Sequence, residues 1–216
     1  MTRPLLLDLF CCEGGAATGY HQAGFDVIGV DIVPQPNYPF PMVQADALNP
    51  PFDLTQFDAI HASPPCQHFT AYGRAVPDIK DRYEDLVEPT RAMLEAADVP
   101  YVIENVEGAP MVDPVTLCGS MFDLDVRRHR LFETNWGLPE HPWPCRHRIW
   151  GRRFKGSTGR KPNSRYTIEV GAWNEPLELQ KRCMGVTHKV TLRGLSEAIP
   201  PAYTRFIGEQ LMRAVA

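Results

Sequence analysis

The first 31 residues place the strongest constraint on the fold. Residues 5–10 are a short, almost wholly apolar run, and a turn at residues 11–15 ends in two glycines. Residues 16–23 can form a helix, and residues 25–31 are a second apolar run that ends in an acid. A strand, a glycine-rich turn, a helix and another strand form the opening of a parallel α/β sheet. Because the strands are apolar throughout rather than alternating, we expect helices on both faces of the sheet.

The rest of the chain continues this pattern as far as residue 134. We predict further strands at residues 57–62, 101–106 and 130–134, a short strand before Asp46, and a helix within residues 75–97. Residues 178–184 and 201–215 also have helical patterns. Residues 135–176 are rich in Pro, Gly, Trp and Arg, and we predict no regular structure there.

Composition excludes several protein classes. Of the 216 residues, 44% are hydrophobic and 22% are charged, which is typical of a globular protein and not of a disordered one. No apolar run reaches the roughly 20 residues of a membrane span, and the run at residues 5–7 is too short for a signal peptide. We therefore expect a soluble intracellular protein whose six cysteines stay reduced.

Charge is distributed unevenly along the chain. Residues 141–165 carry eight Lys or Arg and no Asp or Glu, although the net charge of the whole chain is −4. Trp143, Trp150 and Phe154 lie among these basic residues. A basic stretch with interleaved aromatic residues favours contact with nucleic acid over a solvated loop that only balances an acidic body.

The turn after the first strand predicts a cofactor site. Ligands of open α/β sheets bind beyond the carboxyl ends of the strands, and Gly14 and Gly15 would allow the backbone to approach a ligand closely. Asp31 stands where an acid would bind a ribose, and Asp46 could accept a hydrogen bond from an adenine amino group. The spacing does not match G-x-G-x-x-G, so we expect a nucleoside-bearing cofactor other than NAD or FAD.

Chemically reactive residues follow the next strands. Cys66 lies in Ser-Pro-Pro-Cys-Gln, directly after a strand, and Glu104 ends the following one. A thiol held by two prolines at the ligand edge fits a nucleophile better than a packing residue, and a nearby carboxylate suggests an acid. Arg128 and Arg130 alternate, so both guanidinium groups can face one side and stabilise a thiolate.

These motifs occur in a specific order: Asp-Leu-Phe at 8–10, Pro-Pro-Cys-Gln at 64–67, Glu-Asn-Val at 104–106 and Arg-x-Arg at 128–130. The series resembles the DNA cytosine-5 methyltransferase family over residues 5–133 and 177–214. The resemblance implies an α/β, Rossmann-like S-adenosylmethionine-dependent methyltransferase sheet with a small, irregular target-recognition insertion. We expect a catalytic and cofactor-binding domain at 1–133, a small basic recognition region at 134–177, and C-terminal helices at 178–216 that return to the catalytic domain.

The resemblance also implies roles for individual residues. Cys66 would add to carbon 6 of a flipped-out cytosine, Glu104 would protonate or hydrogen-bond N3, and Asn105, Arg128 and Arg130 would complete the catalytic set. S-adenosylmethionine would lie against Asp8, Phe10, Cys11, Cys12, Glu13, Gly14, Gly15, Asp31, Ile32, Asp46, Ala47, Pro65, Leu86, Glu197 and Ala198. Double-stranded DNA would contact Gln67, Thr70, Arg146, Arg148, Arg152, Arg153 and Lys155.

Three positions depart from the family pattern. Cys12 replaces a glycine of the first loop, Val126 replaces the glutamine before the paired arginines, and Ser196-Glu197 replaces Gly-Asn. A modified S-adenosylmethionine is therefore an alternative methyl donor. The short recognition region predicts a short target sequence. The resemblance and the small size imply a monomer, alone or beside a restriction enzyme, in the cytoplasm of a bacterium or of a phage-infected cell.

Several alternatives remain open at this stage. A related tRNA cytosine-5 methyltransferase would share the same motifs, and an inactive binding relative would share the fold. His141, Cys145 and His147 form an H-x3-C-x-H cluster that Cys118, His129 or Cys183 could complete as a zinc site. We expect no metal and interpret the cluster as polar residues that face DNA.

Overall fold

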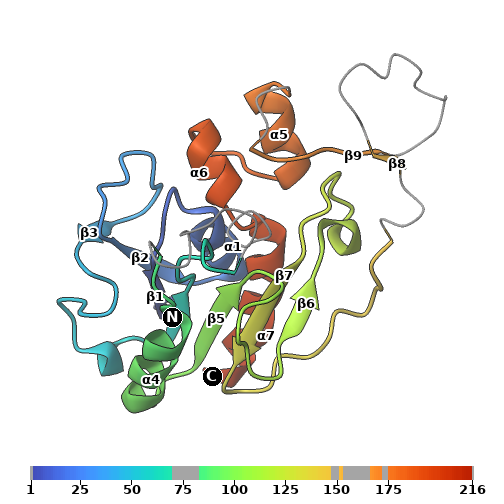
Figure 1. Ribbon diagram of the computed structural model, residues 1–216. Coiled ribbons are helices and arrows are strands. Elements are labelled where there is room, and N and C mark those ends of the chain that lie inside the picture. Colours follow the sequence, from blue (N-terminus) through green and yellow to red (C-terminus); the bar gives the residue numbers. More distant parts are fainter. Residues whose placement is uncertain (1, 70–82, 147–150, 153–165, 172–174, 216) are drawn as a thin grey trace.

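A seven-stranded mixed sheet forms the centre of the molecule (Figure 1). The structure, a computed structural model, describes residues 2–69, 83–146, 151–152, 166–171 and 175–215. In spatial order, the strands are β3 (Met42–Gln44), β2 (Asp26–Asp31), β1 (Leu5–Leu9), β4 (Ala59–Ala62), β5 (Tyr101–Asn105), β7 (Arg130–Thr134) and β6 (Val115–Leu117). The first five are mutually parallel, and β7 runs antiparallel to both of its neighbours.

The predicted strands are confirmed, and the predicted parallel opening extends from β3 through β5, after which β7 is antiparallel. β7 is antiparallel because the chain leaves β6 through a short 3-10 helix, η2 (Gly119–Phe122), rather than through a crossover helix. Parallel neighbours need a long crossover connection, whereas antiparallel neighbours can be joined more directly. Sequence analysis did not predict β6, a strand of only three residues.

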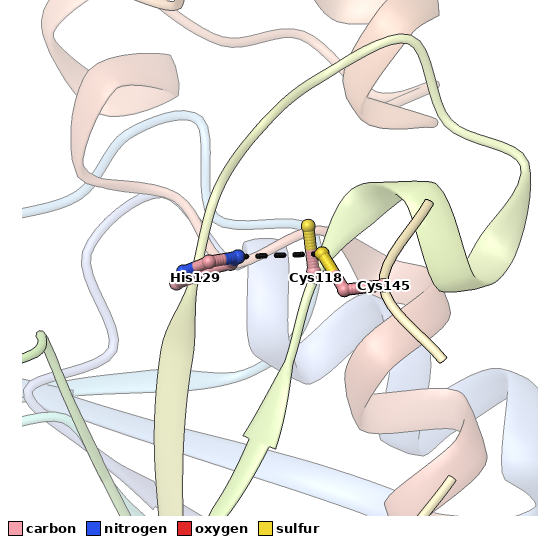
Figure 2. A group of neighbouring side chains, drawn as sticks. All are labelled: Cys118, His129 and Cys145. Atoms are coloured by element: carbon pink, nitrogen blue, oxygen red, sulfur yellow. Dashed lines mark hydrogen bonds between the residues drawn. The ribbon is translucent and has the colours of Figure 1, made fainter. Parts of the chain in front are cut away.

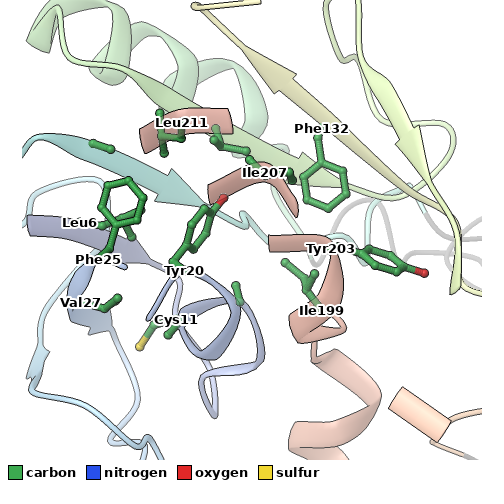
Figure 3. Packing of buried hydrophobic residues seen from close by; sticks show 14 of the residues in the cluster. Leu6, Cys11, Tyr20, Phe25, Val27, Phe132, Ile199, Tyr203, Ile207 and Leu211 are labelled. Atoms are coloured by element: carbon green, nitrogen blue, oxygen red, sulfur yellow. The ribbon is translucent and has the colours of Figure 1, made fainter. Parts of the chain in front are cut away.

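Helices cover both faces of the sheet, as the continuous apolar strands predict. The helices α1 (Gly15–Ala23) and α7 (Pro201–Ala214) contribute Tyr20 and Ile207 to a core cluster on one face (Figure 3). The helix α4 (Val87–Ala97) contributes Leu94 to the cluster on the other face. Within β1, Leu6 belongs to the first cluster and Leu7 to the second, because successive side chains of a strand point to opposite faces.

The C-terminal helix is part of the central fold. A Cβ atom at Gly19 of α1 would lie 2.0 Å from the Thr204 Oγ1 atom of α7, so the two helices need glycine to pack this closely. The Thr204 hydroxyl donates a hydrogen bond of 2.8 Å to the Ala16 carbonyl. The last residues therefore pack on the first helix, next to the turn that follows β1.

Five smaller helices and strands of the described residues lie outside the central sheet. They are the 3-10 helix η1 (Leu54–Gln56), the helices α5 (Leu177–Met184) and α6 (Leu192–Glu197), and the paired strands β8 (Gly151–Arg152) and β9 (Tyr166–Thr167). A third core cluster includes Val126, Ile168 and Met184. Ile168 also forms a bridge with Val126, so the end of the predicted recognition region packs on the segment between η2 and β7.

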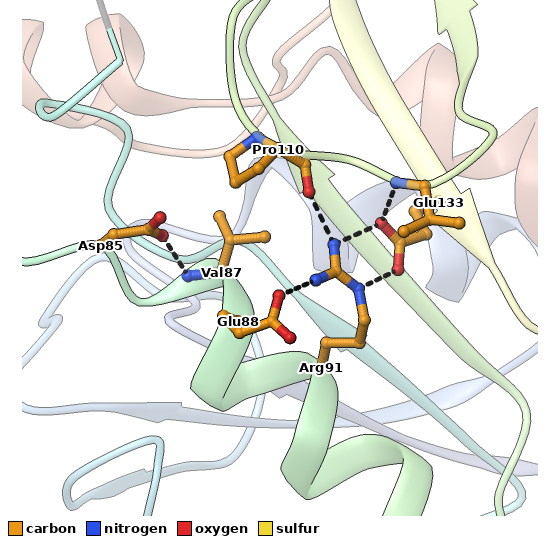
Figure 4. Close-up of polar contacts among 7 residues, drawn as sticks. Asp85, Val87, Glu88, Arg91, Pro110 and Glu133 are labelled. Carbon is orange, nitrogen blue, oxygen red and sulfur yellow. Dashed lines mark hydrogen bonds and ion pairs between the residues drawn. The ribbon is translucent and has the colours of Figure 1, made fainter.

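An ion pair joins α4 to β7 (Figure 4). The Arg91 Nε and Nη2 atoms donate to the two Glu133 carboxylate oxygens at 2.6 and 2.8 Å, and Nη2 also reaches the Pro110 carbonyl at 2.8 Å. Glu88 contacts Arg91 Nη1 from the solvent side. Both members of the central pair are buried, so every donor and acceptor of the pair matters for stability.

Among the described residues, no helix is both long enough and apolar enough to cross a membrane.

Candidate active site

The reactive residues gather at the carboxyl edge of the sheet. β4 and β5 pair in parallel, with Ala62 opposite Ile103, so the turn after β4 lies beside the end of β5. The Asn105 Nδ2 atom donates a hydrogen bond of 3.0 Å to the Pro64 carbonyl, while its Oδ1 atom accepts one from the Val106 N–H group. Asn105 thereby fixes the proline turn that carries Cys66 to the end of β5.

Glu104 is buried beside an arginine. Its Oε1 atom lies 2.9 Å from Arg130 Nε, and the two side chains are only 8% and 16% exposed. Burial raises the pKa of Glu104, while the Arg130 and Arg128 guanidinium groups and a hydrogen bond from Ser63 act in the opposite direction. This carboxyl group can therefore hold a proton at a higher pH than an exposed glutamate.

Arg128 connects this edge to the C-terminal segment. Its Nη2 atom donates to the Ser196 carbonyl at 2.6 Å, and the Tyr203 hydroxyl donates to the Arg128 carbonyl at 2.6 Å. Burial and the nearby Arg130 charge lower the pKa of Arg128 to about 9, so the guanidinium is still charged at neutral pH. In the described part of the chain, the buried Arg128 Nε atom has no hydrogen-bond partner, so a polar group of a ligand could satisfy it.

Cys66 shares the electrostatic environment of these three residues. Burial raises the pKa of its thiol, and Glu104 acts in the same direction, while Arg130 and Arg128 lower it. Since a thiolate is the reactive form, the two cations favour nucleophilic chemistry at this position. A thiol, a carboxyl group and two guanidinium groups thus meet at one sheet edge, which suits covalent addition assisted by an acid.

Sequence analysis missed a buried polar chain behind Glu104. The Tyr20 hydroxyl lies 3.0 Å from His61 Nδ1, and His61 Nε2 lies 2.9 Å from the Ser63 hydroxyl, which bonds to Glu104. His61 is fully buried, and burial lowers its pKa to about 3, so the ring is neutral. One polar residue within the otherwise apolar strand β4 was the available signal.

The turn after β1 has an unusual backbone. Phe10, Cys12 and Gly14 all have positive φ angles, of 57°, 44° and 83°. The Asp31 carboxylate accepts hydrogen bonds from the Cys12 and Val33 N–H groups at 3.0 and 2.9 Å. Asp31, predicted to bind a ribose, therefore also stabilises the backbone of this turn. Cys12 adopts a left-handed conformation, which glycine favours.

The C-terminal segment closes over this turn. A Cβ atom at Gly15 would lie 2.6 Å from the Ile199 carbonyl and 3.0 Å from the Ala198 side chain. Ala198 is buried, whereas Glu197 lies at the surface and pairs with Arg193 at 3.2 Å. Gly15 and Ala198, predicted separately to bind a cofactor, are therefore direct neighbours.

Three predicted cofactor residues direct their side chains into internal contacts. Asp8 accepts a hydrogen bond of 3.1 Å from the Tyr38 hydroxyl, and burial raises its pKa. Cys11 lies in the core cluster that includes α1. Both Glu13 carboxylate oxygens bond to Thr191, at 2.6 and 2.8 Å. These side chains hold the turn in place, and only its backbone is left to approach a ligand.

The other predicted cofactor residues lie along the same side of the fold. Ile32 follows β2 and is 68% exposed, and Asp46 lies at the surface after β3, where it accepts hydrogen bonds from Leu48 and Asn49. Ala47 is buried in the second core cluster, Leu86 precedes α4, and Pro65 is half-buried. The exposed apolar Ile32 beside Asp31 fits contact with the flat face of a base.

Only some of the residues predicted to contact nucleic acid lie in the described part of the structure. Gln67 is half-buried in the turn after Cys66, and Arg146 forms an ion pair with Asp123 at 3.0 Å. The backbone of Arg152 belongs to β8. Thr70, Arg148, Arg153 and Lys155 lie outside the described residues.

The H-x3-C-x-H cluster is not assembled as its spacing suggested. His141 packs against Phe122 and Phe206, with ring centroids 4.5 and 4.8 Å apart. Cys183 is buried in the third core cluster, and His147 lies outside the described residues. Cys145 instead lies beside Cys118 and His129.

Comparison with known proteins supports a methyltransferase relationship. The chain is 32% identical over 127 residues to the type II methyltransferase M.XorII of Xanthomonas oryzae. This match covers 50% of the chain but only 29% of the relative, so the chain spans less than a third of that protein's length. No protein-family model matches the chain.

Solved structures agree on the fold. A prophage-encoded E. coli protein described as a DNA modification methyltransferase matches 97% of the chain and 99% of its own, with a TM-score of 0.64 and 15% identity. The Entamoeba histolytica methyltransferase EhMeth matches 100% of both chains, with a TM-score of 0.63 and 11% identity. The chain has a methyltransferase fold. A Spodoptera frugiperda DNMT2 variant also matches, at a TM-score of 0.61 and 14% identity over 98% of the chain and 99% of its own.

Proposed function

We propose that the chain is a DNA cytosine-5 methyltransferase that uses S-adenosylmethionine. The observation that carries the proposal is the meeting of Cys66, Glu104, Arg128 and Arg130 at one sheet edge, where Glu104 and Arg130 are 2.9 Å apart. Similarity to a type II methyltransferase over half the chain supports the same reaction class. The monomeric state, any restriction partner, a short target sequence and a cytoplasmic location belong to this proposal.

The residues of the first turn suit S-adenosylmethionine. When bound, the cofactor supplies an electrophilic methyl group. The turn backbone at Cys12–Gly14 would approach its methionine part, Asp31 would bind its ribose, and Ile32 and Asp46 would contact its adenine. The left-handed backbone and the exposed Ile32 are the features of this chain that fit such a ligand.

The chemistry of cytosine explains the need for both a thiol and an acid. Carbon 5 is too weak a nucleophile to attack a sulfonium methyl group unaided. When the Cys66 thiolate adds to carbon 6 and Glu104 protonates N3, carbon 5 becomes enamine-like and can take the methyl group. Loss of the carbon 5 proton to water, followed by return of the N3 proton to Glu104, would then allow the carbon–sulfur bond to break, which restores the aromatic ring and the Cys66 thiolate.

Arg128 and Arg130 would assist at two points. Their positive charges favour the Cys66 thiolate before addition, and their N–H groups can bind the cytosine oxygen. Base flipping costs a few kcal/mol, which contacts within this buried site would offset. Basic residues of the 141–165 stretch would contact phosphates and so hold the nucleic acid in register.

The direct test is transfer of a labelled methyl group from S-adenosylmethionine to mixed-sequence duplex DNA and, separately, to tRNA. We expect 5-methylcytosine in DNA. Label in tRNA alone would replace this proposal with the RNA enzyme, and bound cofactor without transfer to either substrate would identify an inactive relative. Sequencing of the methylated sites would report the target length, and a long, strictly specified target would contradict a short recognition region.

The dependence of kcat/KM on pH should be bell-shaped. Activity should rise with pH as the Cys66 thiol ionises, since burial raises its pKa, and fall again as Glu104 loses the proton it donates. Because burial raises both pKa values, both limbs of the profile should lie at higher pH than for an exposed glutamate and an exposed cysteine. A Glu104→Gln variant should lose most activity, and its residual activity should lack the falling limb. An unchanged falling limb in that variant would show that another group is the acid.

A further inference from the structure

A second cluster of reactive side chains lies beside the candidate active site. Cys118 follows β6, His129 precedes β7, and Cys145 belongs to the segment that leads into the basic stretch (Figure 2). Their sulfur and nitrogen atoms all lie within 4.8 Å of one another. The proposed methyl transfer uses none of these three side chains.

The donor atoms suit a transition metal. His129 Nε2 lies 3.4 Å from Cys145 Sγ. In a tetrahedral zinc site with Zn–S near 2.3 Å and Zn–N near 2.0 Å, neighbouring ligand atoms are about 3.3–3.8 Å apart. Two thiols and an imidazole are the donors of structural zinc sites, and they exclude the oxygen-seeking ions Mg²⁺ and Ca²⁺.

The surroundings of His129 support binding through Nε2. Its Nδ1 atom lies 3.1 Å from Glu107 Oε1, and because a carboxylate only accepts hydrogen bonds, Nδ1 carries the proton. The lone pair of a neutral ring then lies on Nε2, on the side of Cys145. A carboxylate that orients a histidine in this way is a recurrent partner of metal-bound histidine.

The two sulfur atoms also share a polar neighbour. The Ser120 hydroxyl, which is fully buried, lies 3.4 Å from both Cys118 Sγ and Cys145 Sγ. Its oxygen accepts a hydrogen bond of 2.9 Å from the Arg146 N–H group. The Ser120 hydroxyl, polarised by this N–H group, can donate to a sulfur and so help to stabilise thiolates.

We propose that Cys118, His129 and Cys145 bind one zinc ion, with the fourth tetrahedral position left to water or another donor. The site joins three separate segments. A bound zinc ion would connect Cys145, at the start of the basic stretch, to His129, which lies between Arg128 and Arg130 in the sequence. Zinc here would therefore set the position of the recognition region relative to the catalytic arginines, while the ion itself takes no part in methyl transfer.

Metal content of the purified full chain tests the proposal directly. We expect one zinc per chain by elemental mass spectrometry, and expect Co²⁺ in its place to give the intense thiolate-to-cobalt charge-transfer absorption of a two-sulfur site. A Cys118→Ser/Cys145→Ser double variant should lose both signals, whereas Cys183→Ser, which removes a buried thiol elsewhere, should keep them. Retention of stoichiometric zinc by the double variant would overturn the proposal.

A gentler variant keeps the test decisive if the double variant does not fold. Glu107 is 67% exposed, and Glu107→Gln should fold normally. It should weaken zinc affinity by about 10- to 100-fold in a competition titration with a chelator, as loss of such carboxylate partners does. Unchanged affinity would contradict the assigned role of His129. Absence of zinc and cobalt binding in the reduced wild-type chain, or a Cys118–Cys145 disulfide in the protein as purified, would refute the site.

Discussion

Replacement of Cys66 by alanine should abolish methyl transfer, with kcat falling by at least about 1000-fold. Without the nucleophile, the enzyme can accelerate the reaction only by binding and orienting its substrates. The variant should therefore lose nearly all of the rate enhancement that the covalent step supplies. The surrounding groups should remain in place, because Asn105 fixes the proline turn through the Pro64 carbonyl rather than through Cys66. Transfer of labelled methyl to DNA, measured under single-turnover conditions, reports the chemical step itself.

The matched control is Cys183→Ala, which removes a buried thiol from the third core cluster. It should keep wild-type turnover unless it unfolds the chain, and thermal unfolding distinguishes these cases. A duplex with 5-fluorocytosine at the target should form a covalent complex with wild type that survives denaturation, because the fluorine cannot leave as a proton does. Cys66→Ala should form none. Near-normal activity in Cys66→Ala would rule out the covalent mechanism while leaving the fold assignment intact.

The sequence predicted the site better than it predicted the surroundings of the site. Proline turns and strand ends are local features, so Cys66 and Glu104 could be placed at one edge from the order of strands alone. The contact between His61 and Tyr20 joins residues 41 positions apart. Such a pair becomes visible only when helix α1 lies on β4, which no periodic pattern specifies.

The same limit explains why the sequence did not identify the proposed zinc ligands Cys118, His129 and Cys145 as one group. Spacing favoured His141, Cys145 and His147 because they are close in sequence, whereas the structure groups Cys145 with Cys118 and His129. The short strand β6 and the antiparallel β7 bring those two residues together, and neither feature was predicted. Spacing along the chain alone therefore could not single out this group, which depends on the pairing of β6 with β7. The parallel βα part of the fold was easier to predict because each strand carried its own apolar signal.

Replacement of Glu133 by glutamine should lower the free energy of unfolding by about 3 kcal/mol, within the range measured when one partner of a buried ion pair is removed. The Glu133 carboxylate accepts from Arg91 at 2.6 and 2.8 Å and from the Val112 N–H group at 2.7 Å. With an amide in its place, the buried guanidinium keeps its charge but loses its buried counter-charge, and only the exposed Glu88 carboxylate remains. Urea denaturation followed by circular dichroism measures the change.

Two further variants separate charge from packing. Glu88→Gln removes the other carboxylate that pairs with Arg91. Because the Glu88 side chain is 75% exposed and solvent screens the pair, the free energy of unfolding should fall by about 1 kcal/mol or less. The Arg91→Met/Glu133→Gln double variant should lose less stability than the sum of the two single variants, since no charge is then left buried alone. If the two losses were simply additive, the pair would not be coupled. Arg91 would then hold α4 mainly to the Pro110 carbonyl, and Glu133 would hold β7 mainly to the Val112 N–H group.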